Sequence, residues 1–209
     1  MIDQGFIEWA ERRHLADRMN AAQIARLQTY VRVLAEWNAR LNLTGFSLTS
    51  DLDPALDRLV LEPVLASVHL DRTIARLLDV GSGSGSPAIP LLIAAPWLEL
   101  TMVESRQRKS VFLRESVRAI GLPATVETAR LEDLAAGWTK EPFDAASIRG
   151  VRLDADLAAG LGKLLPAGGR LFYFDSTDAT LPRLNGFTTS STEDFESLPG
   201  FRLSVLKRL

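Results

Sequence analysis

The sequence predicts an α/β fold: a doubly wound, mostly parallel seven-stranded sheet of the Rossmann-like kind, preceded by a helical N-terminal extension. Short apolar runs alternate with helix candidates along the middle of the chain, which is typical of parallel strands whose connecting helices cover both faces. A glycine-rich loop follows the first of these runs. Two β-rich runs near the C-terminus are separated by an acidic turn, which predicts a closing hairpin.

The helical extension comes first along the chain. Residues from about 3 to 42 favour helix, because apolar side chains recur at spacings of three, four and seven, the stripe of an amphipathic helix. The stripe consists of Ile24, Leu27, Val31, Leu34 and Leu41. Another helix is expected at Leu56–Leu70. We therefore expect a helical cap over residues 1–70 and a sheet domain over residues 71–209.

The elements of the sheet domain follow in order. Parallel strands are expected at Arg76–Val80, Leu98–Val103, Ala124–Thr128, Asp144–Ile148 and Gly169–Phe174. Helices are expected between them at Ile89–Ala95, Gln107–Ile120 and Asp154–Leu165. The hairpin pairs Gly186–Ser191 with Phe201–Leu206 and brings the sheet to seven strands.

Composition limits the functions open to this chain. Its 209 residues, 46% hydrophobic and 24% charged, fit one globular domain with a modest extension. The absence of cysteine excludes disulfides, thiolate catalysis and cysteine zinc sites, and the two histidines lack metal-ligand spacing, so no metal is expected. No window approaches the roughly 18 apolar residues of a membrane span, and no signal-peptide core is present, so we expect a cytoplasmic protein without membrane contact. The net charge of -2 leaves any RNA contact to local basic patches.

The glycine-rich loop is the most informative segment. It reads GSGSG (Gly81–Gly85), directly after a strand that carries Asp79. Glycine permits positive φ and close approach of the backbone to a ligand, and a loop that leads into a helix presents free N–H groups. The loop therefore predicts an adenosine-type cofactor at the carboxyl edge of the sheet. Ser86 stands where a dinucleotide fingerprint has its third glycine, and no P-loop is present, which disfavours NAD, FAD and nucleoside triphosphates.

Two further features follow the next two strands. Glu104, at the end of the second strand, is placed to accept hydrogen bonds from both ribose hydroxyls of an adenosine. The segment that contains Leu131 and Glu132 follows the third strand, where it would border an adenine ring. Simpler explanations stay open: Asp79 capping the glycine loop, Glu104 paired with Arg106 or Arg108, and Leu131–Asp133 as the acidic start of a helix.

Two motifs carry a resemblance to a known family. One is AEWN (Ala35–Asn38) running into LNLT (Leu41–Thr44), and the other is DVGSGSGSPAIPL (Asp79–Leu91). With them the chain resembles the bacterial small-subunit ribosomal RNA guanine-N7 methyltransferases, the glucose-inhibited division protein B family, from about residue 24 to the C-terminus. Further matches are Glu104-Ser105, Arg108-Lys109, Leu131-Glu132, Phe143-Asp144 and Arg149.

The resemblance implies a class I S-adenosylmethionine-dependent methyltransferase that acts on N7 of a guanine in 16S ribosomal RNA. Its partner would be ribosomal RNA or the small ribosomal subunit, and we expect a monomer. The implied cofactor-binding residues are Asp79, Gly81, Gly83, Gly85, Ser86, Glu104, Leu131 and Glu132. Arg149 is implied as the catalytic residue, at a mouth that faces cofactor and substrate, and the substrate-binding residues are Asn42, Arg108, Lys109 and Arg149.

The chemistry of guanine N7 agrees with what the sequence lacks. This nitrogen is a lone-pair acceptor without a proton to remove, so its methylation requires alignment more than a general base. No Asn-Pro-Pro-Tyr or Asp-Pro-Pro-Tyr motif follows the fourth strand, as an exocyclic-amine methyltransferase would commonly have, and no cysteine is available for attack on a pyrimidine. A ring nitrogen, a ribose oxygen or a small molecule remain as acceptors.

The chain departs from the family pattern near the expected substrate mouth. Leu59 stands where the family usually has histidine, and Glu62 replaces its aspartate. Asp175-Ser176 follows the fifth strand where the family usually has lysine and glycine, which reverses a charge. Two alternatives therefore remain: a methyltransferase of the same ancestry acting on a small molecule or another RNA, and a catalytically inactive S-adenosylmethionine-binding protein.

Overall fold

The computed structural model describes residues 2–178, 180–181 and 183–209, and within them it confirms the predicted fold class. These residues contain a seven-stranded sheet in the order β3-β2-β1-β4-β5-β7-β6. The strands from β1 to β5 run parallel, whereas β7 is antiparallel to both β5 and β6. Their bounds are β1 (Arg76–Val80), β2 (Glu99–Val103), β3 (Ala124–Glu127), β4 (Ala145–Arg149), β5 (Arg170–Ser176), β6 (Phe187–Asp194) and β7 (Phe201–Arg208).

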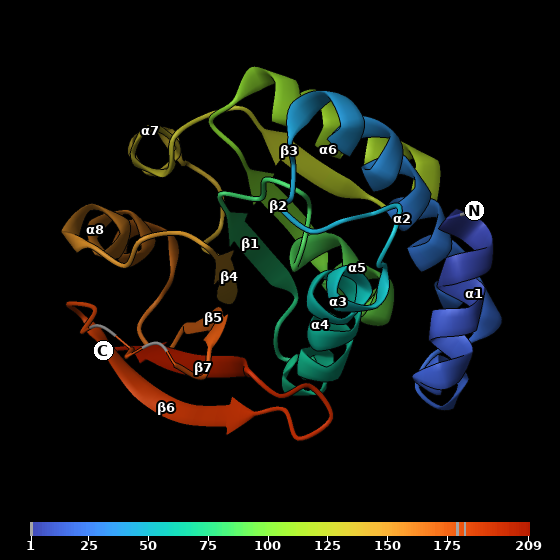
Figure 1. The fold of residues 1–209 in the computed structure, drawn as a ribbon. Coiled ribbons are helices and arrows are strands. Elements are labelled where there is room, and N and C mark those ends of the chain that lie inside the picture. The colour runs from blue at the N-terminus through green and yellow to red at the C-terminus, as the bar shows by residue number, and fades with distance from the viewer. Residues whose placement is uncertain (1, 179, 182) are drawn as a thin grey trace.

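Helices cover both faces of the sheet (Figure 1). α7 (Leu131–Gly137) and α8 (Ala155–Leu164) lie on one face, and α2 (Ala21–Leu41), α5 (Ala88–Ala94) and α6 (Gln107–Ile120) lie on the other. The remaining helical segments are α1 (Ile2–Arg12), α3 (Asp53–Leu56), a π-helical turn (Asp57–Leu61), α4 (Glu62–Ala66) and two 3₁₀ turns (Leu15–Asp17 and Ser67–His69).

The chain order of the strands reverses between β1 and β4, the two central parallel strands. Loops on either side of such a reversal turn away in opposite directions and leave a crevice at the carboxyl ends of the strands. The glycine-rich loop follows β1 directly, and Arg149 is the last residue of β4. The fold therefore places these two predicted features at the same crevice.

The helical character predicted for residues 3–42 is divided between two helices, α1 and α2. A capping box starts α2: the Asn20 side chain accepts from the Gln23 N–H, and the Gln23 side chain accepts from the Asn20 N–H, both at 3.0 Å. His14, in the break, has a φ of 50°, in the left-handed region. The predicted second helix, Leu56–Leu70, is a chain of short helical segments from α3 to the second 3₁₀ turn.

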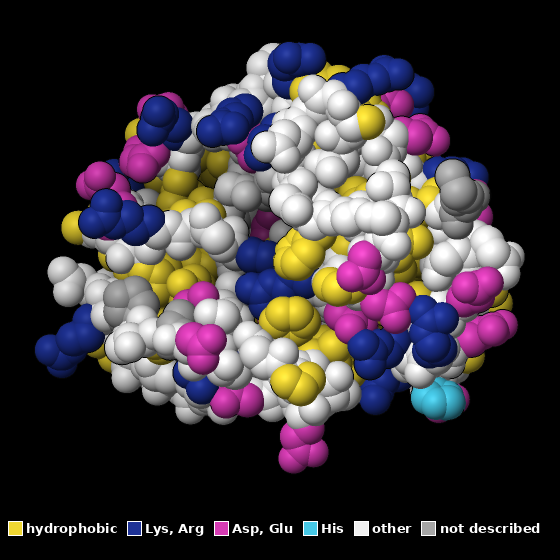
Figure 2. All heavy atoms as spheres, in the orientation of Figure 1, with side chains coloured by type: hydrophobic (Ala, Val, Ile, Leu, Met, Phe, Trp, Pro, Cys, Tyr) yellow, Lys and Arg dark blue, Asp and Glu magenta, His cyan; other side chains and the backbone are white. Residues whose placement is uncertain are grey.

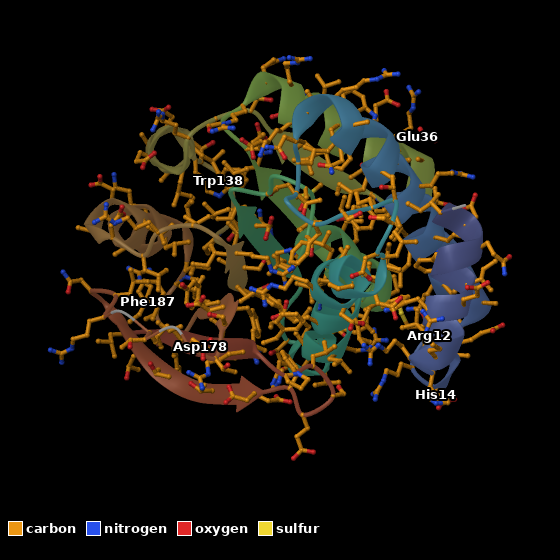
Figure 3. All side chains as sticks on the ribbon, viewed as in Figure 1. Arg12, His14, Glu36, Trp138, Asp178 and Phe187 are labelled. Carbon is orange, nitrogen blue, oxygen red and sulfur yellow. The ribbon has the colours of Figure 1, made fainter. Side chains whose placement is uncertain are left out.

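The N-terminal helices pack into the core of the sheet domain. Buried Leu27 and Leu34 of α2 belong to the same apolar cluster as Ile89 and Phe112 of α5 and α6. At the edge of the molecule, Arg12 of α1 (labelled in Figure 3) pairs with Asp53 at 2.7 Å and ties α1 to α3. One face of the sheet is thus buried by helices from both predicted parts of the chain. The division at residue 70 stays a prediction.

Candidate functional site

The glycine-rich loop folds back over the end of β2. The Gly81 and Ser82 N–H groups donate to the Val103 carbonyl at 2.8 and 3.1 Å. Gly81, Gly83 and Gly85 have φ values of +72°, +48° and +84°, a region that L side chains rarely adopt. The repeated glycines are therefore explained by backbone conformation, since each alternate residue of the loop is left-handed.

Glu104 fastens this loop to the start of α6. The side chain is buried, and Oε2 accepts from the Gly83 N–H at 3.0 Å while Oε1 accepts from the Arg106 N–H at 2.8 Å. Among the described residues, Glu104 forms no ion pair with Arg106 or Arg108, in contrast to the simpler explanation considered above. A carboxylate has about four lone-pair positions, so the contact with the loop leaves acceptor capacity for a ligand. The ribose-binding role stays a prediction.

Two cavities meet at Gly81. The first, of about 340 Å³, extends from the ends of β1 and β2 to the start of α7, and its lining includes the predicted Leu131 and Glu132. The second, of about 430 Å³, lies between the glycine loop, the segment after α2 and the end of β5, and its lining includes Ser86 and Arg149. Figure 2 shows Lys and Arg side chains at the centre of this face of the molecule, with hydrophobic side chains beside them.

The remaining predicted loop residues have different positions. Gly83 lines the second cavity. Gly85 lies against the interior, because a Cβ there would be 2.7 Å from Ile89 Cδ1 and 3.3 Å from Leu113 Cδ2. This packing explains Gly85 without a ligand, and among the described cavity linings it appears in neither cavity. Its role in cofactor binding stays a prediction.

Arg149 is held in a buried network rather than free at the mouth. Its Nη1 donates to the Ser86 hydroxyl at 2.8 Å and to the Arg58 carbonyl at 2.7 Å, and its Nη2 pairs with Glu62. The guanidinium lies 4.9 Å from the Phe174 ring centroid. Burial lowers the pKa of Arg149 to about 10, and the attraction of Glu62 partly offsets that shift.

Glu62 is the centre of this network. Its side chain has no exposed surface and pairs with Arg149 and, at 2.8 Å, with Arg58. Burial raises the pKa of Glu62, against the attraction of both arginines. The π-helical turn before Glu62 belongs to the same hydrogen-bond network, because the Leu59 carbonyl of this turn accepts from the Ser86 hydroxyl at 2.8 Å. Ser86 therefore joins the glycine loop to the N-terminal helices, and Leu59 lines the second cavity.

Asp79 of β1 and Tyr30 of α2 are buried polar residues next to the glycine loop. Asp79 Oδ1 accepts from the Ser147 hydroxyl at 2.6 Å, whereas Oδ2 is buried without a hydrogen-bond partner. Burial raises the pKa of Asp79 to about 6, with Ser147 acting in the opposite direction. The Tyr30 hydroxyl, from α2, donates to the Ser84 carbonyl at 2.8 Å. The Asp79 side chain thus bonds to the neighbouring strand β4. The simpler explanation, in which it caps the loop by bonding to the loop amides, does not hold.

A third, basic cavity borders the second. It has a volume of about 290 Å³ and lies at the N-terminus of α6. Its lining contains four cationic side chains and two others: Arg40, Leu41, Arg106, Gln107, Arg108 and Lys109. Lys109 lines both this cavity and the second one. The predicted substrate residues Arg108 and Lys109 therefore lie side by side at the rim of the crevice.

Asn42 does not line any of these cavities as described. It is exposed and ends α2 in the left-handed conformation, with a φ of 48°. The side-chain Oδ1 of Asn38, one turn earlier, accepts from the Leu43 and Thr44 N–H groups at 2.7 and 2.9 Å. Part of the AEWN–LNLT motif is thus accounted for by the turn that delivers Leu43 and Thr44 to the second cavity. Substrate binding by Asn42 stays a prediction.

Sequence reasoning missed the roles of Glu62 and Tyr30. An acid inside the apolar run LVLEPVLA, four residues after Arg58, is a usable signal, because such a carboxylate needs a cation and the i,i+4 spacing supplies one. Tyr30 carries no comparable signal, since its partner is a main-chain carbonyl far along the chain.

Comparison with known proteins places the chain in a family. The family model described as rRNA small subunit methyltransferase G, GidB, matches residues 23–180. The chain belongs to this family. The Ribosomal RNA small subunit methyltransferase G of Xanthomonas axonopodis pv. citri is 36% identical over 166 residues, 77% of this chain and 73% of that relative. The protein of the same name from Xanthomonas oryzae pv. oryzae is 33% identical over 202 residues, 91% of this chain and 87% of the relative.

Solved structures show the same fold at low identity. MtNAS in complex with MTA and tNA matches with a TM-score of 0.61 and 14% identity, covering 89% of this chain and 76% of that chain. The putative methyltransferase yhhF from Escherichia coli matches with a TM-score of 0.56 and 14% identity, covering 70% and 84%. The GidB chain is therefore a methyltransferase with the class I fold, and S-adenosylmethionine is its methyl donor.

In the part of the chain that the structure describes, no helix is long and apolar enough to cross a membrane. No group of three or more His, Cys, Asp or Glu side chains there could hold a metal ion.

Proposed function

We propose that this chain transfers the methyl group of S-adenosylmethionine to N7 of a guanine in 16S ribosomal RNA. One observation carries the proposal: two separate cavities, one bordered by Leu131 and Glu132 and the other by Arg149, meet at Gly81 in the crevice of the sheet. Such an arrangement accommodates the adenosine of the donor in the first cavity and, in the second, the donor's methionine group beside the acceptor base, with the reacting atoms near Gly81. The names of the relatives supply the substrate class.

The residues at the junction fit S-adenosylmethionine. Gly81 lines both cavities and has no side chain, and a Cβ there would lie 2.7 Å from Val151 Cγ2, so any larger residue would crowd this position. Leu131 and Glu132 border the first cavity, where the adenine ring would lie, and the cations Lys109 and Arg149 border the second, where a methionine carboxylate needs donors. When bound, S-adenosylmethionine supplies a methyl group on a positively charged sulfur.

The chain's own contribution is positioning. Guanine N7 carries a lone pair and no proton, so no general base is required. Ser86, Glu62 and the Arg58 carbonyl fix the Arg149 guanidinium in one place. Alignment of this kind supplies up to about 7–11 kcal/mol of barrier lowering in well-ordered reactions. Arg149 would therefore orient the reactants, and its loss would lower turnover more than cofactor affinity.

The basic rim supplies the RNA contact in this proposal. Arg108 and Lys109 at the N-terminus of α6 would bind RNA phosphate, since both the cations and the helix dipole favour an anion there. Asn42 would contact the RNA from the exposed end of α2. We further propose that the protein is a monomer that acts in the cytoplasm on ribosomal RNA or the small subunit.

Methyl incorporation tests the proposal. Small ribosomal subunits, naked 16S ribosomal RNA and a pool of small metabolites are each incubated with the enzyme and labelled S-adenosylmethionine, and labelled RNA is mapped to the nucleotide and atom. Label on guanine N7 supports the proposal. Label only in a small molecule would support the small-molecule alternative, and label in none of them would support an inactive protein or another RNA substrate.

A further inference from the structure

An acidic side chain stands in the cavity proposed for the acceptor. Asp175, near the end of β5, lines the second cavity together with Tyr173, and residues two apart on a strand share one face of the sheet. Asp175 Oδ1 accepts from the Ser176 N–H at 2.8 Å. The neighbouring Arg58 guanidinium donates to the Asp175 main-chain carbonyl at 3.2 Å and pairs with Glu62 instead of the Asp175 carboxylate.

The Asp175 carboxylate has spare acceptor capacity. Among the residues that the structure describes, no cation forms an ion pair with it, and Arg202, which lies opposite Asp175 on β7, is paired with Asp194 at 2.6 Å. An anion at an RNA-binding mouth repels phosphate, so the partner that suits it in an RNA is a neutral hydrogen-bond donor. N–H donors of a nucleobase are such a partner. Aromatic side chains for stacking stand beside it, because Tyr173 and the 38% exposed Phe46 line the same cavity from different segments.

We propose that Asp175 selects guanine by accepting hydrogen bonds from its N1–H and N2–H groups, while Tyr173 and Phe46 stack on the base. This inference rests on the proposed function. Guanine has two adjacent donors on its Watson–Crick edge, whereas adenine presents its N1 acceptor there, which a carboxylate repels. N7 lies on the opposite, Hoogsteen edge of the ring and stays free to face the glycine loop.

The charge of Asp175 also suits the reaction. The sulfur–methyl bond breaks as the N7 lone pair forms the new carbon–nitrogen bond, so the positive charge passes from sulfur to the purine and no proton leaves. A carboxylate hydrogen-bonded to the purine then faces charge that grows toward the transition state, and fixed charges placed in this way lower a barrier. Asp175 would therefore affect turnover as well as the choice of base.

A comparison of two substrates in two enzymes tests the inference. The substrate is 16S ribosomal RNA, assembled or free as the wild-type enzyme requires, with guanosine or inosine at the mapped position. Inosine keeps N7 and N1–H but lacks the N2 amino group. Asp175→Asn keeps an acceptor for the Ser176 N–H but offers the base one acceptor and one donor. Asp178→Asn, outside the second cavity as described, makes the same change in net charge and is the control (Asp178 is labelled in Figure 3).

The expected results are specific. Asp175→Asn lowers kcat/KM on guanosine by about 10- to 100-fold, the range of a lost bidentate contact, whereas its affinity for S-adenosylmethionine and its circular dichroism match the wild type. For the wild type, kcat/KM is about 10-fold lower on inosine than on guanosine. For Asp175→Asn, kcat/KM is the same on both substrates, because inosine lacks the N2 amino group that would face the NH₂ of the asparagine. Asp178→Asn behaves as the wild type does on both substrates.

Other results would overturn the inference. An equal inosine penalty in wild type and Asp175→Asn would give Asp175 a merely structural role. Faster methylation by Asp175→Asn would mean that the carboxylate only repels RNA. In both cases the proposed function stands. If the wild type methylates neither RNA, the proposed function fails, and the inference fails with it.

Discussion

Replacement of Glu62 by glutamine is expected to destabilise the fold far more than an ordinary polar substitution. The carboxylate is fully buried and accepts from two guanidinium groups, those of Arg58 and Arg149. Glutamine keeps the shape but offers a single acceptor, and its NH₂ group faces one of the arginines. Two cations would then lie close together in the interior without the anion that compensates them.

The expected magnitude follows from burial on both sides of the pair. Burial raises the pKa of Glu62 and lowers that of Arg149 to about 10, so each charge is unfavourable alone. Removal of one partner from such a pair costs about 3–5 kcal/mol, whereas removal of both costs much less. Glu62→Gln should therefore lower the free energy of unfolding by about 3–5 kcal/mol. Glu62→Gln combined with Arg149→Met should cost about 2–3 kcal/mol less than the sum of the single variants.

Urea unfolding at neutral pH measures these differences, with circular dichroism as the probe and an unchanged slope against urea as the condition for comparison. Glu115→Gln is the control, because its pair with Arg118 lies at the surface with a nitrogen–oxygen distance of 3.5 Å and should matter little. A loss below about 1 kcal/mol for Glu62→Gln, or single effects that add within about 0.5 kcal/mol, would refute the reasoning.

Three further predictions concern the loop and its supports. The pKa of Asp79 is raised to about 6, so between about pH 4 and 6 the folded state binds a proton that the unfolded state has released. The stability that this group contributes is therefore present below about pH 4 and is lost as the pH rises through about 6. Urea unfolding should show this loss in the wild type but not in Asp79→Asn. Gly81→Ala should cost more stability than Gly121→Ala, although both glycines have positive φ, because only the Gly81 Cβ meets a side chain, at 2.7 Å; equal unfolding midpoints would contradict this. Glu104→Ala should weaken S-adenosylmethionine binding by about 1–3 kcal/mol in calorimetry, and Glu99→Ala, with a side chain 79% exposed, should leave it unchanged; unchanged affinity in both would remove Glu104 from the cofactor site.

Local sequence signals predict most of the fold. Every predicted strand lies within two residues of an observed one at its start, and the helix Gln107–Ile120 is reproduced at both ends. These elements are set by periodicity and by glycine, which act over a few residues. The break between α1 and α2 also has a local signal, the capping box of Asn20 and Gln23, which a hydrophobic stripe alone does not reveal.

Contacts between distant segments explain what the sequence left open at the site. The sequence predicts Arg149 at the mouth of the crevice, whereas the structure holds it in a buried pair with Glu62, which comes from a helix 87 residues earlier in the chain. Gly85 matches a cofactor motif, yet it packs on Ile89 and Leu113, which only the folded α5 and α6 bring together. The sequence shows Asp175 as a charge reversal, and its position with Tyr173 in one cavity suggests a partner for that charge.

The most direct measurement of the central claim is the position of the transferred methyl group. Small subunits and naked 16S ribosomal RNA are incubated with the wild-type enzyme and S-adenosylmethionine, and the modified nucleotide is identified by mass spectrometry and by chain cleavage at N7-methylguanosine. The proposed function predicts one methyl group on N7 of a guanine, and its loss when Gly81, at the junction of the two cavities, is replaced by valine. Methylation of another base or of ribose, or none in either RNA, would contradict it.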